Sequence, residues 1–318
     1  MADTNGSFWL PPQSSTVAAA SDSLFDFIYW LNVIFFVGIT VATVYFVVRY
    51  RRKSDDQLAT SKVAHNTVIE AAWTFIPLVL LVVCFAWGFR LFLHQSVAPG
   101  DALQIEVRAQ QWSWGFAYGN GTQTLNELYV PAGRPVKMLI SSKDVLHSFF
   151  VPDFRVKADA VPGRYTSVWF EAMEPGEHQI YCTEYCGTSH SGMLGTVKVL
   201  PADEFDKMYK QGMWPGQTGA GRDPVEWGAE LFTSKTCNAC HSVDGTRLVG
   251  PSLKGVFGKQ EPITGGPAVA VDENYIRESI MDPNAKIVEG YPPAMPSFKG
   301  QLTDDQISAL IAYIKSLK

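Results

Sequence analysis

The sequence predicts a multi-domain membrane protein with three folded parts: a two-helix transmembrane hairpin, an antiparallel β-sandwich and a C-terminal all-α domain. Two charge-free apolar runs lie within the first 90 residues, and apolar residues then alternate with period two through about residue 200. Helical spacing returns after about residue 225, around two closely spaced cysteines. A length of 318 residues fits about two globular domains plus membrane segments, and a net charge of −5 shows no basic excess that would indicate nucleic-acid binding.

The hairpin is expected over residues 24–94. Residues 27–48 carry no charge and are enough for a helix to cross about 30 Å of hydrocarbon. The second charge-free run, residues 71–89, contains Pro77, which a membrane helix tolerates because local adjustment re-satisfies the freed carbonyl. Buried helices of a soluble domain are the alternative, but two runs of this length favour the membrane.

Basic residues predict the topology of this hairpin. They gather between the two spans, whereas the outer lead, residues 1–23, has none. The basic residues of the loop are Arg49, Arg51, Arg52, Lys53 and Lys62. By the positive-inside rule the loop, about residues 49–66, is cytoplasmic, and the lead and everything after about residue 94 face outward. Without a basic n-region the lead is not expected to be a cleavable signal peptide, although trimming of a longer precursor stays open.

A β-sandwich is expected over residues 95–200. Apolar residues alternate in short runs that are typical of half-buried strands, at 103–109, 136–140, 165–170, 178–181 and 196–200. Pro-Gly pairs at 162–163 and 175–176 separate some of these runs. About 100 residues of short, turn-separated strands favour an antiparallel sandwich.

A metal loop lies near the end of this domain. Residues 182–193 hold two thiols, an imidazole and a thioether: Cys182, Cys186, His190 and Met193. This set favours copper, because soft sulfur ligands with a weak Met are typical of electron-transfer copper sites and structural zinc rarely takes a thioether. A plain disulfide with Met193 as core filler is the alternative. His147 argues against it, because an isolated histidine on an apolar strand edge would be unusual.

A tether and a haem-binding domain are expected after the sandwich. Residues 201–224 are rich in Gly, Pro and polar groups without clear periodicity, which is typical of a linker. In the following domain, residues 225–318, the run Cys237-Asn238-Ala239-Cys240-His241 is the attachment signature of a c-type haem. The two thiols bond the haem vinyl groups and the histidine becomes an axial ligand. A thioredoxin-like redox pair is the alternative, but the adjacent histidine favours haem.

The second axial ligand of such a haem should lie downstream. Met295 is expected to fill this role, because the Pro-rich loop 291–298 can present a thioether. Met281 falls in a helical run, residues 274–281, and is expected in the core. Helices are also expected at 225–233 and 303–317.

These motifs resemble the second subunit of haem-copper cytochrome c oxidases. The pattern C-x-E-x-C-x3-H-x2-M in residues 182–193 matches its binuclear copper signature, the CuA site. Further matching pieces stand at residues 111–114, 144–148 and 159–164, and the resemblance runs from about residue 24 to about 200. Residues 225–318 resemble a small cytochrome c. The resemblance implies a cupredoxin fold for the sandwich and electron transfer as its activity.

The resemblance also implies a set of copper ligands. Cys182 and Cys186 would bridge two copper ions. His147 and Met193 would complete one ion, and His190 with the backbone carbonyl of Glu184 would complete the other.

Three further roles are implied by the resemblance. The Glu184 carboxylate would bind a magnesium ion shared with the neighbouring subunit. Trp112, the first tryptophan of Gln-Trp-x-Trp, would be the point where an electron enters the copper site, with the reservation that a fused donor domain docks differently. Glu70, at the cytoplasmic end of the second span, would feed protons into a channel of the catalytic subunit, and a solvated helix-end acid is its alternative.

The function implied by the resemblance is the electron intake of a terminal respiratory oxidase in a bacterial inner membrane. A soluble or membrane-bound cytochrome c, or another small redox donor, would reduce the haem. The haem would reduce the copper pair, and a multi-span haem-copper subunit would turn oxygen into water. Further oxidase subunits and membrane lipid are expected partners, and nucleic acid is not. The chain would belong to a proton-translocating oxidoreductase without being catalytic alone. The corresponding subunit of a nitric oxide reductase and a free-standing membrane-anchored electron carrier or copper-handling protein are the alternatives.

Overall fold

The chain divides into two compact units. The computed structural model describes residues 6–58, 61, 63–215, 217, 219 and 221–318. One unit is Val17–Val97, and the other comprises Met1–Thr16 and Ala98–Lys318. The first five residues of the predicted lead, Lys62 of the predicted basic loop, and residues 216, 218 and 220 of the predicted tether lie outside the described residues.

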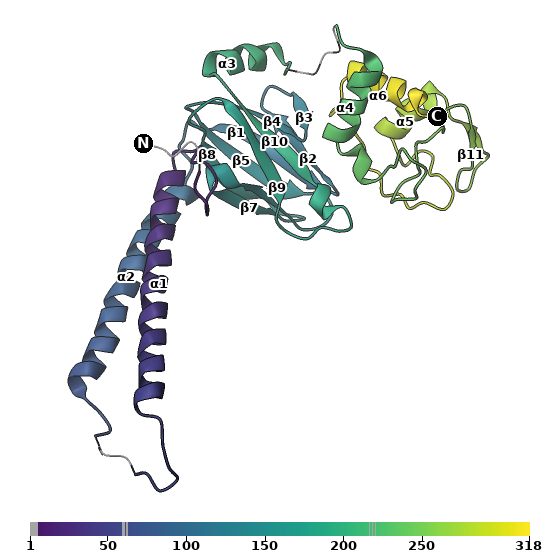
Figure 1. The fold of residues 1–318 in the computed structure, drawn as a ribbon. Helices are drawn as coiled ribbons and strands as arrows, with labels where there is room; N and C mark the ends of the chain where they lie inside the picture. The colour runs from purple at the N-terminus through teal and green to yellow at the C-terminus, as the bar shows by residue number, and fades with distance from the viewer. Residues whose placement is uncertain (1–5, 59–60, 62, 216, 218, 220) are drawn as a thin grey trace. The chain divides into compact units, whose positions relative to one another are not determined.

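The smaller unit is a hairpin of two long helices, α1 (Ala18–Arg49) and α2 (Thr67–Ser96), which lie side by side in Figure 1. Both are long and apolar enough to cross a membrane, and they contain the two predicted charge-free runs. The rings of Phe27 and Trp87 meet between them, with centroids 5.5 Å apart. Pro77 lies inside α2 without ending it.

The larger unit contains a sandwich of two five-stranded sheets (Figure 1). The first sheet has the order β3-β2-β1-β5-β8, with strands Gln123–Leu125, Ser113–Tyr118, Leu103–Gln110, Pro135–Ser142 and Thr166–Glu171. The second has the order β4-β10-β9-β6-β7, with strands Glu127–Pro131, Leu194–Leu200, Gly176–Cys182, His147–Val151 and Val156–Ala160. Two short 3-10 turns, η1 (Pro152–Phe154) and η2 (His190–Gly192), lie between strands.

The predicted sandwich is confirmed, but its sheets are mixed rather than purely antiparallel. β1 pairs in parallel with β5, and β4 pairs in parallel with β10. Parallel neighbours need a crossover connection instead of a tight hairpin, and three strands intervene between β1 and β5 along the chain. Alternation in the sequence shows which side chains are buried, but it carries no information on the direction of the neighbouring strand.

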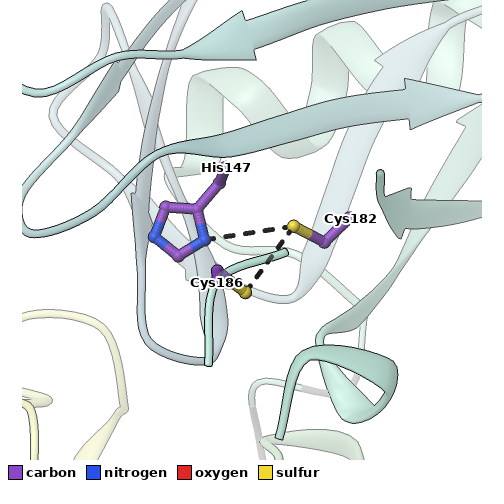
Figure 2. Close-up of side chains that lie close together, drawn as sticks. All are labelled: His147, Cys182 and Cys186. Atoms are coloured by element: carbon purple, nitrogen blue, oxygen red, sulfur yellow. Dashed lines mark hydrogen bonds between the residues drawn. The ribbon is translucent and has the colours of Figure 1, made fainter. Parts of the chain in front are cut away.

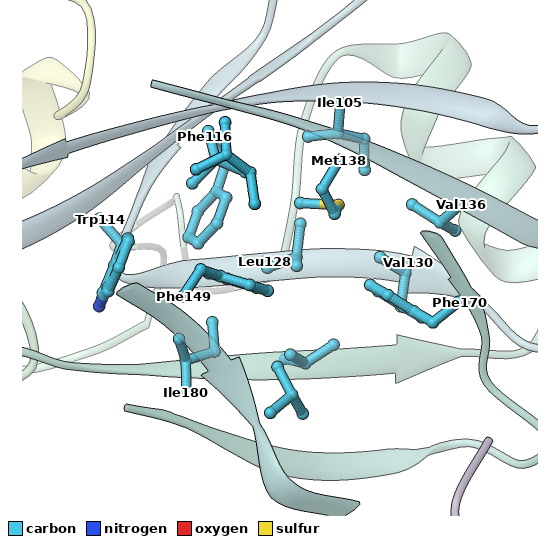
Figure 3. Packing of buried hydrophobic residues seen from close by; sticks show 14 of the residues in the cluster. Ile105, Trp114, Phe116, Leu128, Val130, Val136, Met138, Phe149, Phe170 and Ile180 are labelled. Atoms are coloured by element: carbon cyan, nitrogen blue, oxygen red, sulfur yellow. The ribbon is translucent and has the colours of Figure 1, made fainter. Parts of the chain in front are cut away.

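The core lies between the two sheets (Figure 3). The alternation in β1 and β5 fills one side of it with fully buried aliphatic side chains: Ile105, Val107, Val136, Met138 and Ile140. Phe149 of β6 and Ile180 of β9 are buried on the other side. Trp114 meets Phe149 edge to face, with centroids 5.5 Å apart, at one end of this core.

The first half of the predicted tether is folded. Residues 202–211 form α3 (Ala202–Gln211), whose Phe205 is buried against the sandwich. Trp214 is also buried and stacks on Tyr129, with centroids 5.0 Å apart and planes at 5°. The expectation of a linker without regular structure was therefore wrong for this half. Phe205, Met208 and Tyr209 recur at helical spacing and form the apolar face that packs on the sandwich.

The C-terminal domain packs three helices, α4 (Pro224–Ser234), α5 (Glu273–Met281) and α6 (Asp304–Ser316), as the sequence predicted. Between them lie η3 (Cys237–Ala239) and a small pair of strands, β11 (Gln260–Glu261) and β12 (Val269–Ala270). Each helix begins after a side chain that accepts hydrogen bonds from its first free amides: Asp223, Asp272 and Thr303. Gly228 lets α4 and α6 cross closely, because a Cβ there would lie 2.1 Å from the carbonyl oxygen of Ala309.

Candidate functional site

Strand pairing brings the predicted copper ligands together. His147 is the first residue of β6, and Cys182 is the last residue of β9. These strands are neighbours, and Phe149 pairs directly with Cys182, so His147 lies close to it although 35 residues separate them along the chain. The loop from β9 to β10 then carries Cys186, while Met193 directly precedes β10.

Two sulfur atoms form the middle of this cluster. Figure 2 shows His147, Cys182 and Cys186 turned toward one another. The Sγ of Cys182 lies 3.8 Å from the Sγ of Cys186 and 4.0 Å from Nδ1 of His147, and all three ligand atoms lie within 4.8 Å of one another. The sulfur separation is far beyond the bond length of about 2.05 Å in a disulfide, so the two thiols are free to bind metal.

The remaining predicted donors surround the same sulfurs. Nδ1 of His190 lies 3.4 Å and Sδ of Met193 lies 3.8 Å from the Sγ of Cys186. The backbone oxygen of Glu184 lies 3.3 Å from the Sγ of Cys182. Two thiols, two imidazoles, a thioether and a carbonyl thus face one small volume. This soft donor set fits copper, and two thiols with four further donors around them are enough ligands for a pair of ions.

Asp144 orients His147 from outside this donor set. Its Oδ1 lies 2.8 Å from Nε2 of His147, and its carboxylate also accepts hydrogen bonds from the amides of Gln111 and Val145. Because Nε2 is hydrogen-bonded to Asp144, the lone pair of Nδ1 is free and faces Cys182. Carboxylates that bond the other nitrogen of a ligand histidine fix its orientation in this way. Burial opposes ionisation of Asp144, but its hydrogen bonds to His147 and to the amides outweigh this and lower the pKa of the carboxyl.

The two thiols differ in acidity. Burial disfavours the Cys182 thiolate, but hydrogen bonds from His147 and from backbone groups outweigh burial and lower its pKa to about 7. Burial and the negative charge of the Cys182 thiolate raise the pKa of Cys186. Without metal the pair therefore accepts one negative charge readily and resists a second. A bound cation compensates the second charge, so metal binding should release protons.

Trp112 lies directly against the copper loop. Gly187, with φ of +121°, approaches it so closely that a Cβ would lie 3.0 Å from Cζ2 of the indole. Gln111 donates a hydrogen bond of 2.7 Å to the carbonyl of Cys186. The structure therefore places Trp112 against the candidate copper loop, and its role in electron entry stays a prediction. The sequence predicted no role for Gln111 or Asp144. An acid three residues before a ligand histidine was nevertheless a signal that Asp144 could hydrogen-bond the imidazole of His147.

Glu70 lies in the other unit. It occupies the first turn of α2, where its carboxylate accepts a hydrogen bond of 2.9 Å from the amide of Asn66. The Asn66 side chain in turn accepts hydrogen bonds from the amides of Val68 and Ile69. Together the two side chains satisfy the free amides at the helix start. This is the behaviour of a helix-end acid, and a role of Glu70 in proton uptake stays a prediction.

The predicted haem ligands line one apolar cavity of about 190 Å³ in the C-terminal domain. Cys237, Cys240, His241 and Met295 all line it. Nδ1 of His241 lies 2.8 Å from the carbonyl oxygen of Pro251, which leaves Nε2 free to bind iron. Met281 ends α5 and packs against the helical core instead, outside the cavity lining. This arrangement fits a covalent haem with one histidine and one methionine ligand.

His241 is held tightly in this position. A Cβ at Gly250 would lie 2.6 Å from Cε1 of His241, so a larger residue there would displace the imidazole. Burial lowers the pKa of His241 and outweighs the hydrogen bond to Pro251. The imidazole therefore stays neutral at physiological pH, which is the state that binds a metal.

The haem cavity also reaches the sandwich. Gln111, Trp112 and Ser113 form part of its lining. Trp112 thus lies between the two candidate sites, against Gly187 of the copper loop and along the wall of the haem cavity.

Comparisons with known proteins show the family of this chain. Residues 3–91 match the family of the cytochrome c oxidase subunit II transmembrane domain, residues 120–200 match its periplasmic domain, and residues 225–318 match cytochrome c. Cytochrome c oxidase subunit 2 of Alkalihalophilus pseudofirmus is 34% identical over 296 residues, which cover 89% of this chain and 83% of that protein. The same subunit of Bacillus sp. strain PS3 is 30% identical and covers 84% and 79%. The solved periplasmic domain of subunit II of cytochrome oxidase from Bradyrhizobium japonicum is 28% identical, with a TM-score of 0.35 over 36% of this chain and 96% of that one.

Proposed function

The chain belongs to the cytochrome c oxidase subunit II family with a fused cytochrome c domain, and from this premise we propose that it is the electron-intake subunit of a terminal respiratory oxidase. Its electrons enter at residues 225–318, cross to the copper domain at residues 95–200 and leave for the haem-copper subunit that reduces oxygen to water. A haem c and a binuclear copper site would each supply a one-electron carrier, and the protein supplies ligands and position.

The observation that carries this proposal is the position of Trp112. Its indole packs against Gly187, the residue after the ligand Cys186, and it also lines the cavity that holds His241. One aromatic side chain therefore lies against both candidate sites. Such an arrangement suits a relay in which electrons pass inside a single chain.

The ligand assignments follow from the donor geometry. We assign His147, Cys182, Cys186, His190, Met193 and the carbonyl of Glu184 to two copper ions. We assign Cys237, Cys240, His241 and Met295 to the haem. The Glu184 carboxylate is left to bind magnesium together with the partner subunit, since carboxylate oxygens are the ligands that this ion prefers.

The membrane anchor sets where this chemistry takes place. Two membrane-spanning helices anchor the chain, and the basic loop of about residues 49–66 places that loop in the cytoplasm. The copper and haem domains then face the periplasm of a bacterial inner membrane. A periplasmic cytochrome c or another small redox donor can reach the haem there, and further oxidase subunits and lipid surround the helices.

Purification in mild detergent tests the proposal. The chain should copurify with a multi-span haem protein, and the complex should consume oxygen when a reduced donor is supplied. Metal analysis of the chain should give two coppers for each covalent haem. Consumption of nitric oxide instead of oxygen, or a chain that purifies alone with one copper, would contradict the proposal.

A further inference from the structure

The segment just before the haem-attachment loop, residues 234–236, makes direct polar contacts with the copper domain. The Lys235 side chain is only 4% exposed. Its Nζ donates a hydrogen bond of 3.0 Å to the carbonyl of Leu125 and forms an ion pair of 2.5 Å with the carboxylate of Glu127. Leu125 ends β3 and Glu127 begins β4, so this charge pair joins the two domains.

Glu127 has a second partner that belongs to its own domain. Lys198 of β10 lies 2.7 Å from the other carboxylate oxygen, and its side chain is 27% exposed. Burial opposes ionisation of Glu127, but Lys235 and Lys198 outweigh burial and hold the pKa of its carboxyl below the usual value. The carboxylate is therefore charged at neutral pH and is shared by one buried lysine and one half-buried lysine.

Two further hydrogen bonds join the haem-attachment loop to the copper domain. The hydroxyl of Thr236, directly before Cys237, lies 3.2 Å from the carbonyl oxygen of Trp112. The hydroxyl of Ser189, directly before the ligand His190, donates 2.8 Å to the carbonyl of Ala239, which lies between the two haem cysteines. The haem-attachment loop is thus bonded to the copper loop itself.

We propose that Lys235 and Glu127 are positioning residues whose ion pair fixes the haem-attachment loop, residues 237–241, against Trp112 and the copper loop, residues 182–193. The haem domain then works from one docked position instead of moving freely relative to the copper domain. Trp112 is partly buried against the haem-attachment loop in this position, so an external donor delivers its electron to the haem domain. This inference rests on the proposed electron path.

The physics of buried charge explains why such a pair fixes a position. Removing Lys235 from water carries a large desolvation penalty, which only a well-placed carboxylate offsets. The pair therefore adds little affinity, but another docking register that buries Lys235 without Glu127 would leave its ammonium unpaired. Removal of either partner should destabilise the docked state, because the other charge is then left buried with one partner fewer.

Chemical labelling tests whether the clamp, the ion pair of Lys235 with Glu127, exists. The full chain is labelled in detergent with haem and copper bound. A small amine-reactive reagent should modify Lys235 at least about tenfold more slowly than the exposed Lys254 of the same domain, because a charged hydrogen bond of ordinary strength must first be broken. Glu127→Gln should raise the Lys235 rate about tenfold on the same grounds. Lys198→Met is the matched control, since it removes the other partner of the same carboxylate without crossing the interface, and it should leave the Lys235 rate nearly unchanged.

The rate of electron transfer from haem to copper, after rapid reduction of the haem, tests the positioning role. Lys235→Met and Glu127→Gln lie in different domains, yet both should slow this step, and the double variant should be no slower than the slower single variant. The haem absorption spectrum and copper content should stay unchanged, which shows that each site is intact.

Each opposite result overturns the inference. Lys235 labelled as fast as Lys254 would show that the Lys235–Glu127 ion pair does not form. Equal slowing of haem-to-copper electron transfer by Lys198→Met and Lys235→Met would show that only the charge balance of Glu127 matters. Unchanged transfer rates in both clamp variants would remove the positioning role. If the unaltered chain itself passes no electron from haem to copper, the proposed function fails, and labelling still decides whether the domains are clamped.

Discussion

The copper site and the haem pocket differ in what holds their ligands in place. The copper donors are held by the sandwich itself, because His147 and Cys182 stand on paired strands and lie within 4.0 Å of each other. The haem ligands instead surround a cavity of about 190 Å³, so a large part of their support must come from the haem. Strand pairing positions the ligands of the first site, whereas the second site relies on its cofactor to fill the cavity.

Loss of the cofactor should therefore affect the two domains very differently, and this is the largest effect we expect. An empty cavity of this size would destabilise the haem domain by about 4 to 5 kcal/mol, at ~24 cal/mol for each Å³. Cys237→Ala with Cys240→Ala should thus leave residues 225–318 open to proteolysis. Cys182→Ser with Cys186→Ser should lose copper while the sandwich keeps its protease resistance. Equal sensitivity of the two domains would contradict the comparison.

The helix crossing in the haem domain gives the next largest effect. Gly228→Ala should destabilise this domain by roughly 3 kcal/mol, because its Cβ would meet the carbonyl oxygen of Ala309 and the helices would have to separate. Thermal unfolding followed by the haem absorption measures this change. Gly266→Ala is the control, since its Cβ would lie 3.9 Å from the nearest side chain. If the haem domain with Gly228→Ala unfolds at the same temperature as the Gly266→Ala control, the two helices do not cross closely at Gly228.

A smaller effect, on copper affinity, is expected for Asp144, which hydrogen-bonds the ligand His147. Asp144→Asn keeps a side chain of the same shape but removes the charge that orients His147. Copper affinity should fall about tenfold, the lower end of what such outer partners contribute. Competition with a copper chelator gives the affinity, and the haem spectrum serves as the internal control. An unchanged affinity would mean that strand pairing alone orients His147.

The smallest effect concerns pH at the domain interface. The pKa of Glu127 is lowered in the folded chain. The ion pair therefore contributes its full stability at any pH above the ordinary pKa of about 4.5, and this stability is lost only as the pH falls through the lower pKa of the folded chain. The ratio of haem-to-copper transfer rates between the unaltered chain and Glu127→Gln should thus be constant from about pH 5 to 8. A ratio that changes near pH 7 would show that another group controls docking.

The sequence predicted the features that local patterns encode. Charge-free runs predicted α1 and α2, alternation predicted β1 and β5, and the loop motif predicted the donors that gather around Cys182 and Cys186. The preference for Met295 over Met281 depended on the prolines of its loop, and the cavity lining now supports it.

The features that the sequence did not predict depend on contacts between distant residues. The parallel pairing of β1 with β5 depends on how the chain crosses the sandwich, and the burial of Phe205 of α3 depends on the apolar core that the strands build. Lys235 and Glu127 are separated by more than 100 residues, and neither differs in type from an ordinary surface charge. Only the fold shows that one of them is buried.

The most direct test of the account is oxygen consumption by the purified complex when Cys186 is replaced by serine. A reduced donor should still reduce the haem, because residues 225–318 are unchanged, but the electron should stop there and oxygen uptake should be lost. Undiminished oxygen uptake with this variant would show that electrons reach the catalytic subunit without the pair of thiols, and it would contradict the account.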